Sequence, residues 1–309
     1  KVTAILGPWS SGQCAAVQPV AMKAKTLMFM ICSSEDATNN VLTDYSVNKY
    51  TFRIGNNQSI LGKVVGSFLQ SVDAKNYYYA GLDFGVWRLV ADFTKQTLDE
   101  NGANIPNIGT DFLSPGTINY DALVLKIAAA KPGFIVTAFH GDDALKMRLA
   151  LDSKPVTAKT PTIHVTDTIH IPSVVAAIQE GSPDAMDGLL VRQEGAIHVP
   201  ITAKTFPTVA KYEAKFGHKP GVLYGLGQYE AMWALTRAAT AANSLDPDDL
   251  VAALEETDYV GALGRIRFYD NHQVQISPTG IPNFVLQWQD DGFKIVWPPA
   301  SAEASYISP

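Results

Sequence analysis

The stretch Lys1–Gln13, KVTAILGPWSSGQ, changes from an apolar run to a helix-start signal within a few residues. Val2–Leu6 has the length and composition of a buried strand, which Gly7-Pro8 ends. Ser10 and Gln13 have the S-x-x-Q spacing of a capping box at the start of a helix. A helix N-terminus with two serine hydroxyls can bind a carboxylate or a phosphate. The simpler interpretation is that the first serine only caps the helix.

The bulk properties of the chain narrow its class. It has 309 residues, which suits one large domain or two lobes. Apolar residues make up 47% and charged residues 17%, so a sizeable core is expected and disorder is not. The net charge of -6 argues against nucleic acid and anionic lipid as partners. We found no apolar run of the roughly 18 residues that a membrane span needs.

The two cysteines, Cys14 and Cys32, leave two arrangements open. A disulfide would suit an oxidising compartment, but free cysteines are commonly buried, and we expect two buried thiols. The chain has no C-x-x-C motif, and His164, His170 and His198 lack the spacing of metal ligands. We therefore predict neither a metal nor a cofactor.

Short apolar runs alternate with helical patterns over most of the chain, which predicts parallel sheets flanked by helices. The expected strands are Val2–Leu6, Leu27–Cys32, Tyr77–Ala80, Phe134–Phe139, Thr162–Val165, Leu189–Val191, Arg265–Tyr269 and Asn283–Gln289. The expected late helices are Thr205–Phe216, Leu226–Ala242 and Asp246–Glu256.

Ligands of parallel sheets bind at the carboxyl ends of strands, so the loops there are the candidate sites. A polar loop, residues 33–40, follows the second strand. Phe84 follows the third, where its ring is either held outward or packed in the core, with Asp83 as a cap. Asp167 follows a later strand and is placed either to meet a ligand ammonium or to cap a helix. The sequence has no G-x-S-x-G, H-E-x-x-H, Walker A or G-x-G-x-x-G motif to indicate catalysis.

Taken together, these loops resemble the type I periplasmic substrate-binding proteins of ABC transporters for branched-chain amino acids. The resemblance lies in an ordered set of stretches across nearly the whole chain. They include AILGPWSSGQ (4–13), MICSSEDATNNVLT (30–43), GLDFGVWRLVADF (81–93), AAKPGFIVTAFHGDDALKMRLAL (129–151) and YGLGQYEAMWAL (224–235).

The resemblance implies two α/β lobes joined by a three-strand hinge that close on a ligand in the cleft between them. Lobe 1 is then expected to be residues 1–73 and 199–279, and lobe 2 residues 74–198 and 280–309. The family usually has a strand–helix–strand–helix unit before the strand that ends in GP. We therefore expect that this N-terminal βαβα unit of lobe 1 is missing from the sequence.

The resemblance also implies site residues. The serine loop and the Ala-Thr loop of the family hold the ligand carboxylate, which matches Ser10, Ser11, Ala37 and Thr38. An aromatic ring covers the ligand, matching Phe84.

The acidic residue that meets the ammonium group in amino-acid binders is nearest to Asp167. Trp9 stands where the family tends to have a smaller residue, and Phe84 lacks the hydroxyl of the usual tyrosine. An aliphatic amino acid is therefore in doubt, and small aromatic or aliphatic carboxylates and amides are alternatives.

From this resemblance we expect a monomeric, periplasmic or lipid-anchored extracytoplasmic protein that is not an enzyme. It is expected to deliver an amino acid or a related acid to the membrane permease of an ABC importer. The alternatives are a sensory ligand-binding domain of a receptor and, less favoured, an enzyme on a doubly wound α/β fold.

Overall fold

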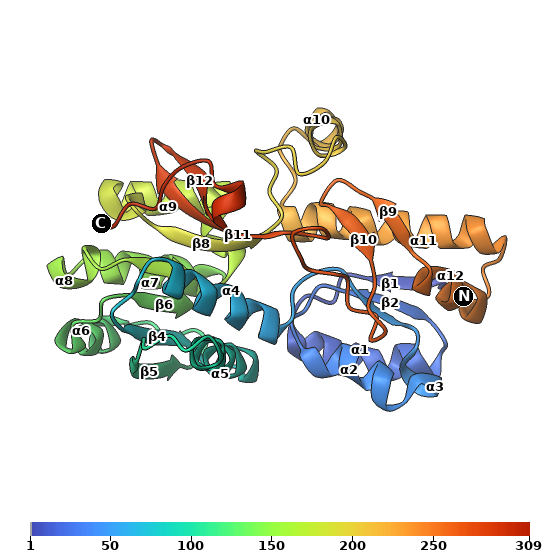
Figure 1. Ribbon diagram of the computed structural model, residues 1–309, viewed down its shortest axis with the longest axis horizontal. Helices are drawn as coiled ribbons and strands as arrows, with labels where there is room; N and C mark the ends of the chain where they lie inside the picture. The colour runs from blue at the N-terminus through green and yellow to red at the C-terminus, as the bar shows by residue number, and fades with distance from the viewer. Residues whose placement is uncertain (1) are drawn as a thin grey trace. The chain divides into compact units, whose positions relative to one another are not determined.

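The structure is a computed structural model that describes residues 2–309, without the side chains of Asp167 and Pro183. It is an α/β protein with mainly parallel sheets flanked by helices, as predicted (Figure 1). The chain divides into two compact units. Unit 1 is residues 1–58 with 194–283, and unit 2 is residues 59–193 with 284–309.

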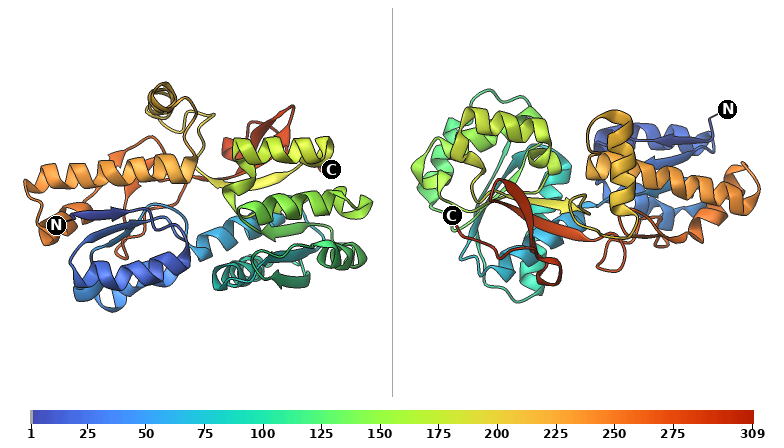
Figure 2. Two further views of the ribbon diagram at one scale, coloured as in Figure 1. Left: turned by 180° about the vertical axis from the view of Figure 1, so that it is seen from behind. Right: turned by 90° about the horizontal axis from the view of Figure 1, so that it is seen from above.

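Unit 1 is built around a parallel three-stranded sheet of order β1-β2-β3. Its N-terminal elements are β1 (Ala4–Leu6), α1 (Ser11–Lys23), β2 (Leu27–Met30), α2 (Glu35–Thr43), α3 (Tyr45–Asn48) and β3 (Thr51–Arg53). Its later elements are α10 (Thr205–Phe216), a π-helical turn (Val222–Gly227), α11 (Gln228–Ala242), α12 (Pro247–Glu255), β9 (Asp258–Val260) and β10 (Arg265–Arg267). Figures 1 and 2 show α1 and α2 on one face of this sheet and α11 on the other.

The core of unit 1 explains these positions. All four residues of β2 are fully buried, as expected for a central strand. Ala231, Ala234 and Ala238 recur at helical spacing on α11 and pack into the same core as β2. Small side chains on this stripe let the helix lie close to the sheet.

Unit 2 contains a seven-stranded sheet of order β12-β11-β8-β7-β6-β4-β5. Its strands are β4 (Tyr77–Leu82), β5 (Asn107–Leu113), β6 (Ile135–Ala138), β7 (Thr162–His164), β8 (Leu190–Glu194), β11 (Asn283–Gln289) and β12 (Gly292–Trp297). Its helices are α4 (Gln58–Ser71), α5 (Gly85–Glu100), α6 (Asp121–Ala130), α7 (Asp142–Asp152), α8 (Pro155–Ala158) and α9 (Pro172–Gly181). Strands β4 to β7 pair in parallel, whereas β11 and β12 are antiparallel.

The division of the chain differs from the predicted lobes at helix α4. The prediction placed residues 59–73 in lobe 1, but α4 packs within unit 2. Leu61, Val65 and Phe68 on α4 are buried against the unit 2 core, and the Phe68 ring meets the Phe134 ring edge to face. These apolar side chains of α4 pack in the core of unit 2, and this packing makes the helix part of unit 2.

A buried polar cluster joins the three segments at which the chain passes between the units. Asn56 Nδ2 donates to Glu194 Oε2 at 2.8 Å and to Asn283 Oδ1 at 2.9 Å. Asn283 Nδ2 donates back to Asn56 Oδ1 at 2.9 Å. Glu194 is 2% exposed, so its carboxylate depends on such donors for the solvation it has lost.

We predict that Asn56→Asp lowers the free energy of unfolding by about 2–3 kcal/mol, because a second carboxylate replaces the donor facing Glu194. Urea denaturation at neutral pH measures this loss. Asn101→Asp is the matched control, since Asn101 is an exposed amide that donates to Gln70. Equal stability of the two variants would contradict the role given to Asn56.

A buried imidazole lies in the sheet of unit 2. His164 on β7 is fully buried, and its Nδ1 lies 2.7 Å from Thr137 Oγ1 on the neighbouring strand β6. Burial, aided by the nearby Arg148 guanidinium, lowers the pKa of His164 to about 3. The folded protein therefore holds this imidazole neutral at pH values where an unfolded chain protonates it.

Between about pH 6.5 and 3 the unfolded chain binds a proton at His164 that the folded chain does not. We predict that stability falls as the pH is lowered through this window, and that His164→Gln makes the fall shallower. Thermal unfolding measured from pH 7 to pH 4 tests the slope. The exposed His218→Gln is the control and should leave it unchanged, whereas an unchanged slope in His164→Gln would exclude His164 as its source.

Candidate ligand-binding site

The β1–α1 junction has the local structure that its sequence predicts. Ser10 caps α1, its Oγ accepting from Gln13 N at 3.2 Å, while Gln13 Oε1 accepts from Ser10 N at 3.4 Å. The predicted capping box is thus confirmed. Ser11, the first residue of α1, is half-buried, and Trp9 is 47% exposed beside it. The junction presents a helix N-terminus, a hydroxyl and an indole ring.

A disulfide between Cys14 and Cys32 joins the first turn of α1 to the segment after β2, with the two Cα atoms 6.7 Å apart. The expectation of two free thiols was wrong. Spacing along the chain does not show that these residues meet, but parallel pairing of β1 with β2 brings the ends of both strands together. Two backbone hydrogen bonds reinforce the link, from Gly7 N to Phe29 O (3.0 Å) and from Ile31 N to Pro8 O (3.2 Å).

The second junction, after β2, is a short turn followed by a helix. The polar loop predicted over residues 33–40 is mostly α2, which begins at Glu35, because polarity alone does not separate a turn from an exposed helix. Ala37 and Thr38 are buried, and Thr38 Oγ1 donates to Glu35 O at 3.2 Å. Ser34 precedes α2 as a half-buried residue without a side-chain capping bond.

Arg53, which the sequence reasoning missed, supports this second junction from the end of β3. Its fully buried guanidinium donates from Nη2 to Ser34 O and from Nη1 to Gln273 Oε1 at 2.9 Å. Burial lowers the pKa of Arg53 to about 9, an effect that the nearby Glu35 opposes. The available signal in the sequence was an arginine between Phe52 and Ile54.

In unit 2, Phe84 lies at the β4–α5 junction with its ring 38% exposed. The alternative of a core phenylalanine is therefore wrong. The predicted capping role of Asp83 is also wrong, since Phe84 holds the cap position and Asp83 pairs with Arg88 at 2.7 Å. The Phe84 ring therefore lies at the surface of unit 2.

His140 stacks on Phe84, and sequence reasoning did not find it. It follows β6, the strand next to β4, and the two ring centroids are 5.5 Å apart at 23°. Trp87 lies beyond, with its ring centroid 6.1 Å from that of His140. Burial lowers the pKa of His140, which favours the neutral imidazole. The three rings form a platform at the carboxyl ends of β4 and β6.

Asp167 follows β7 in the chain, but its side chain lies outside the described part of the structure. The helix near Pro172 begins with Ile171 at its cap position, so Asp167 is not the cap of α9. The interaction of Asp167 with a ligand ammonium group stays a prediction.

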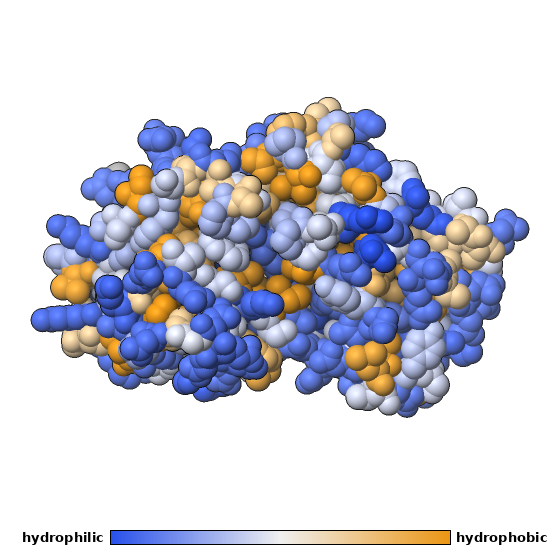
Figure 3. Space-filling model, viewed as in Figure 1, coloured by the Kyte–Doolittle hydropathy of each residue, from blue (hydrophilic) through white to orange (hydrophobic). Residues whose placement is uncertain are grey.

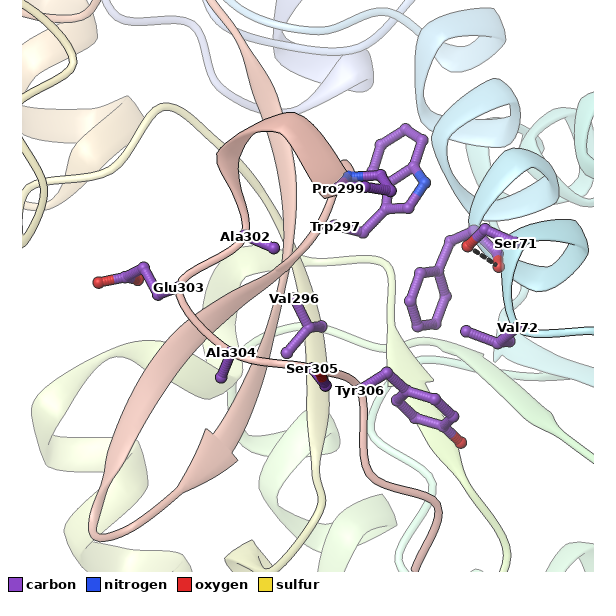
Figure 4. A pocket seen from close by; sticks show the side chains of 11 residues that line it. Ser71, Val72, Val296, Trp297, Pro299, Ala302, Glu303, Ala304, Ser305 and Tyr306 are labelled. Carbon is purple, nitrogen blue, oxygen red and sulfur yellow. Dashed lines mark hydrogen bonds between the residues drawn. The ribbon is translucent and has the colours of Figure 1, made fainter.

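A separate hollow of unit 2, about 510 Å³, lies between α4, β12 and the C-terminal tail (Figure 4). Trp297 and Tyr306 line it, and Glu303 points away from both rings. The Glu303 carboxylate accepts from Ile295 N at 2.9 Å. The Glu303 carboxylate is thus engaged by the backbone of β12, and the walls of this hollow mix apolar and polar groups, with Ser71 and Ser305 among them.

Within residues 2–309, no helix is both long and apolar enough to span a bilayer. No group of three or more His, Cys, Asp or Glu side chains in this range is arranged to hold a metal ion. On the face drawn in Figure 3, hydrophilic residues predominate and apolar residues form small clusters between them.

The fold and these junctions define a class of protein, the ligand-binding proteins with two α/β units. The model of the periplasmic binding protein family matches residues 1–292, and the chain belongs to this family. The predicted resemblance and fold class are confirmed. A search of curated proteins finds no match.

Solved structures of this class share the fold at low identity. One is a substrate-binding protein of a branched-chain amino acid transporter from Streptococcus pneumoniae, in complex with isoleucine (TM-score 0.80, 16% identity, 100% of this chain and 80% of that one). Another is an ABC transporter solute-binding protein from R. palustris in complex with benzoate (TM-score 0.78, 15% identity, 99% of this chain and 79% of that one). A third is a leucine-binding protein from Thermotoga maritima (TM-score 0.77, 18% identity, 95% of this chain and 79% of that one).

We predict that replacing both Cys14 and Cys32 by serine lowers the free energy of unfolding by about 3 kcal/mol, because the disulfide closes a loop with a sequence separation of 18. Chemical denaturation of the variant and of the oxidised protein gives the difference. A denaturation midpoint that does not move on substitution, or on reduction of the native protein, would contradict a formed disulfide.

Proposed function

We propose that this chain is an extracytoplasmic solute-binding protein that captures a small carboxylate-bearing ligand and delivers it to the membrane permease of an ABC importer. Membership of the periplasmic binding protein family supports this role. We further propose that it works as a monomer and binds its ligand without transforming it. Its ligand is an amino acid or a related aliphatic or aromatic acid.

One observation carries the proposal for the ligand class. The N-termini of α1 and α2 belong to two neighbouring junctions that a disulfide and two backbone hydrogen bonds hold together. Helix N-termini carry partial positive charge and free N–H groups, and both favour a carboxylate. We propose that Ser10, Ser11, Ala37 and Thr38 form this carboxylate cradle.

The individual roles within the cradle differ. The Ser10 hydroxyl already accepts from Gln13 N, so it acts mainly by fixing the α1 N-terminus. Ser11 has no capping duty and is proposed as the direct hydroxyl donor. Thr38 donates to Glu35 O and is fully buried, so it contacts a carboxylate only if the start of α2 shifts and its hydroxyl rotates. Arg53 is proposed as a positioning residue that holds Ser34 in place.

We propose that unit 2 contributes the remaining contacts through Phe84 and Asp167 when the two units close on the ligand. Phe84 offers an exposed ring backed by His140, which suits an apolar or planar side chain. Trp9 is proposed to contact the same part of the ligand from unit 1. Asp167 is proposed to pair with an ammonium group, which an amino acid has and a benzoate lacks.

We predict that Ser11→Ala with Thr38→Val weakens ligand affinity by at least about 10-fold, because each hydroxyl bond to a charged group contributes about 1.5–3 kcal/mol. A thermal-shift screen of amino acids, keto acids and benzoates first finds a ligand, and isothermal titration then measures the affinity.

The matched control is Thr43→Val. Thr43 also sits on α2 and donates three residues back, to Asn40 O, but at the exposed end of the helix. The account requires unchanged affinity in this control and unchanged apo stability in the double variant. Full affinity in the double variant would contradict the placement of the cradle.

A further inference from the structure

Unit 1 carries a hollow of about 280 Å³ between α10, α11 and β9. Figure 1 shows α10 near the start of α11. Tyr229 and Trp233, one turn apart on α11, line the hollow with ring centroids 6.2 Å apart, and they are 40% and 44% exposed. Tyr259 of β9 adds a third ring. Large exposed rings gathered around a concave surface are characteristic of a binding site.

Two cationic side chains also line this hollow. The Arg237 guanidinium lies 4.9 Å from the centroid of the Tyr259 ring, and Lys204 Nζ donates to Val260 O at 2.6 Å. Within residues 2–309 neither cation forms an ion pair, and no hydrogen-bond acceptor for Arg237 is found. An arginine held against an aromatic ring keeps its planar donors available for a carboxylate.

Glu230 is the one carboxylate among the lining residues, and protein donors occupy both of its oxygens. Tyr259 Oη donates to Oε2 at 2.9 Å and Ala262 N donates to Oε1 at 2.5 Å. Any side chain at Gly261 would collide with this carboxylate, since a Cβ there would lie 2.3 Å from Oε2. Glu230 is therefore a structural group of the floor. Its donors are neutral and its carboxylate interacts electrostatically with Lys204, so two cations stand against one carboxylate among the lining residues.

We propose that this hollow binds a small planar aromatic carboxylate, with its ring against Trp233 and Tyr229 and its carboxylate on Arg237 and Lys204. A flat ring gains from the aromatic walls, and the two cations supply charge-assisted hydrogen bonds to the carboxylate. The site uses none of the residues of the β1–α1 and β2–α2 junctions. It is thus a second site, independent of the proposed carboxylate cradle.

An adjoining hollow shares Trp233 and Arg237 and contains Glu256 and Asp258. Asp258 forms an ion pair with Arg265, with 2.5 Å between Asp258 Oδ1 and Arg265 Nε, and this pairing offsets the charge of the carboxylate. Acidic groups on that side make a cationic aromatic ligand the natural competitor. Benzylamine is therefore included as the opposite-charge probe, and benzamide as the neutral one.

The test is a ¹⁹F NMR titration of the full chain labelled with 5-fluorotryptophan, with benzoate as the probe. The chain has five tryptophans, and Trp233→Phe assigns the reporting resonance. We expect benzoate to shift the Trp233 resonance saturably. Arg237→Gln should weaken the fitted affinity by at least about 10-fold, with partial recovery in Arg237→Lys. Thr236→Ala, an exposed neighbour on α11 outside this hollow, should leave the affinity unchanged.

Trp9 serves as a second reporter, because it lies at the proposed carboxylate cradle. If benzoate shifts the Trp9 resonance alone, the second site is overturned and the proposed function stands. If benzoate shifts the Trp233 resonance alone, the second site is supported. Equal or tighter binding of benzylamine or benzamide at Trp233 would overturn the assignment of an anionic ligand. An unchanged affinity in Arg237→Gln would overturn it as well.

Discussion

The covalent and hydrogen-bonded link between the β1–α1 and β2–α2 junctions is the constraint on which the rest of the account depends. Parallel pairing of β1 with β2 places the ends of the strands side by side, and the Cys14–Cys32 bond then fixes the start of α1 beside the start of α2. Two helix N-termini held together concentrate positive potential at one edge of the sheet. Neither junction alone has more than the ordinary features of a capped helix.

Much of the fold followed from the sequence because its signals are local. The capping box at Ser10 and the apolar runs of β2 and β4 were predicted close to their observed positions, since central strands of a parallel sheet tend to be near-continuous apolar runs. The strands β3 (TFR) and β9 (DYV) were missed because each is short and neither is part of a continuous apolar run. Edge strand β5 was missed because its sequence, NIGTDFL, has no continuous apolar run, as suits a strand in which no residue is fully buried.

The parts of the site that the sequence did not reveal depend on contacts between distant segments. The disulfide, the bond from Arg53 to Ser34 and the stacking of His140 on Phe84 each join residues from different strands. Such contacts appear only once sheet order is known, because the order decides which strand ends are neighbours. Helix α4 shows the same limit, since its place in the sequence did not reveal the unit in which it packs.

A crystal structure of the protein with its captured ligand tests whether the paired junctions hold a carboxylate. We expect carboxylate oxygens about 2.7–3.1 Å from the Ser11 hydroxyl and from backbone N–H groups at the start of α1 or α2. A ligand bound elsewhere, with these groups left in contact with water, would contradict this expectation.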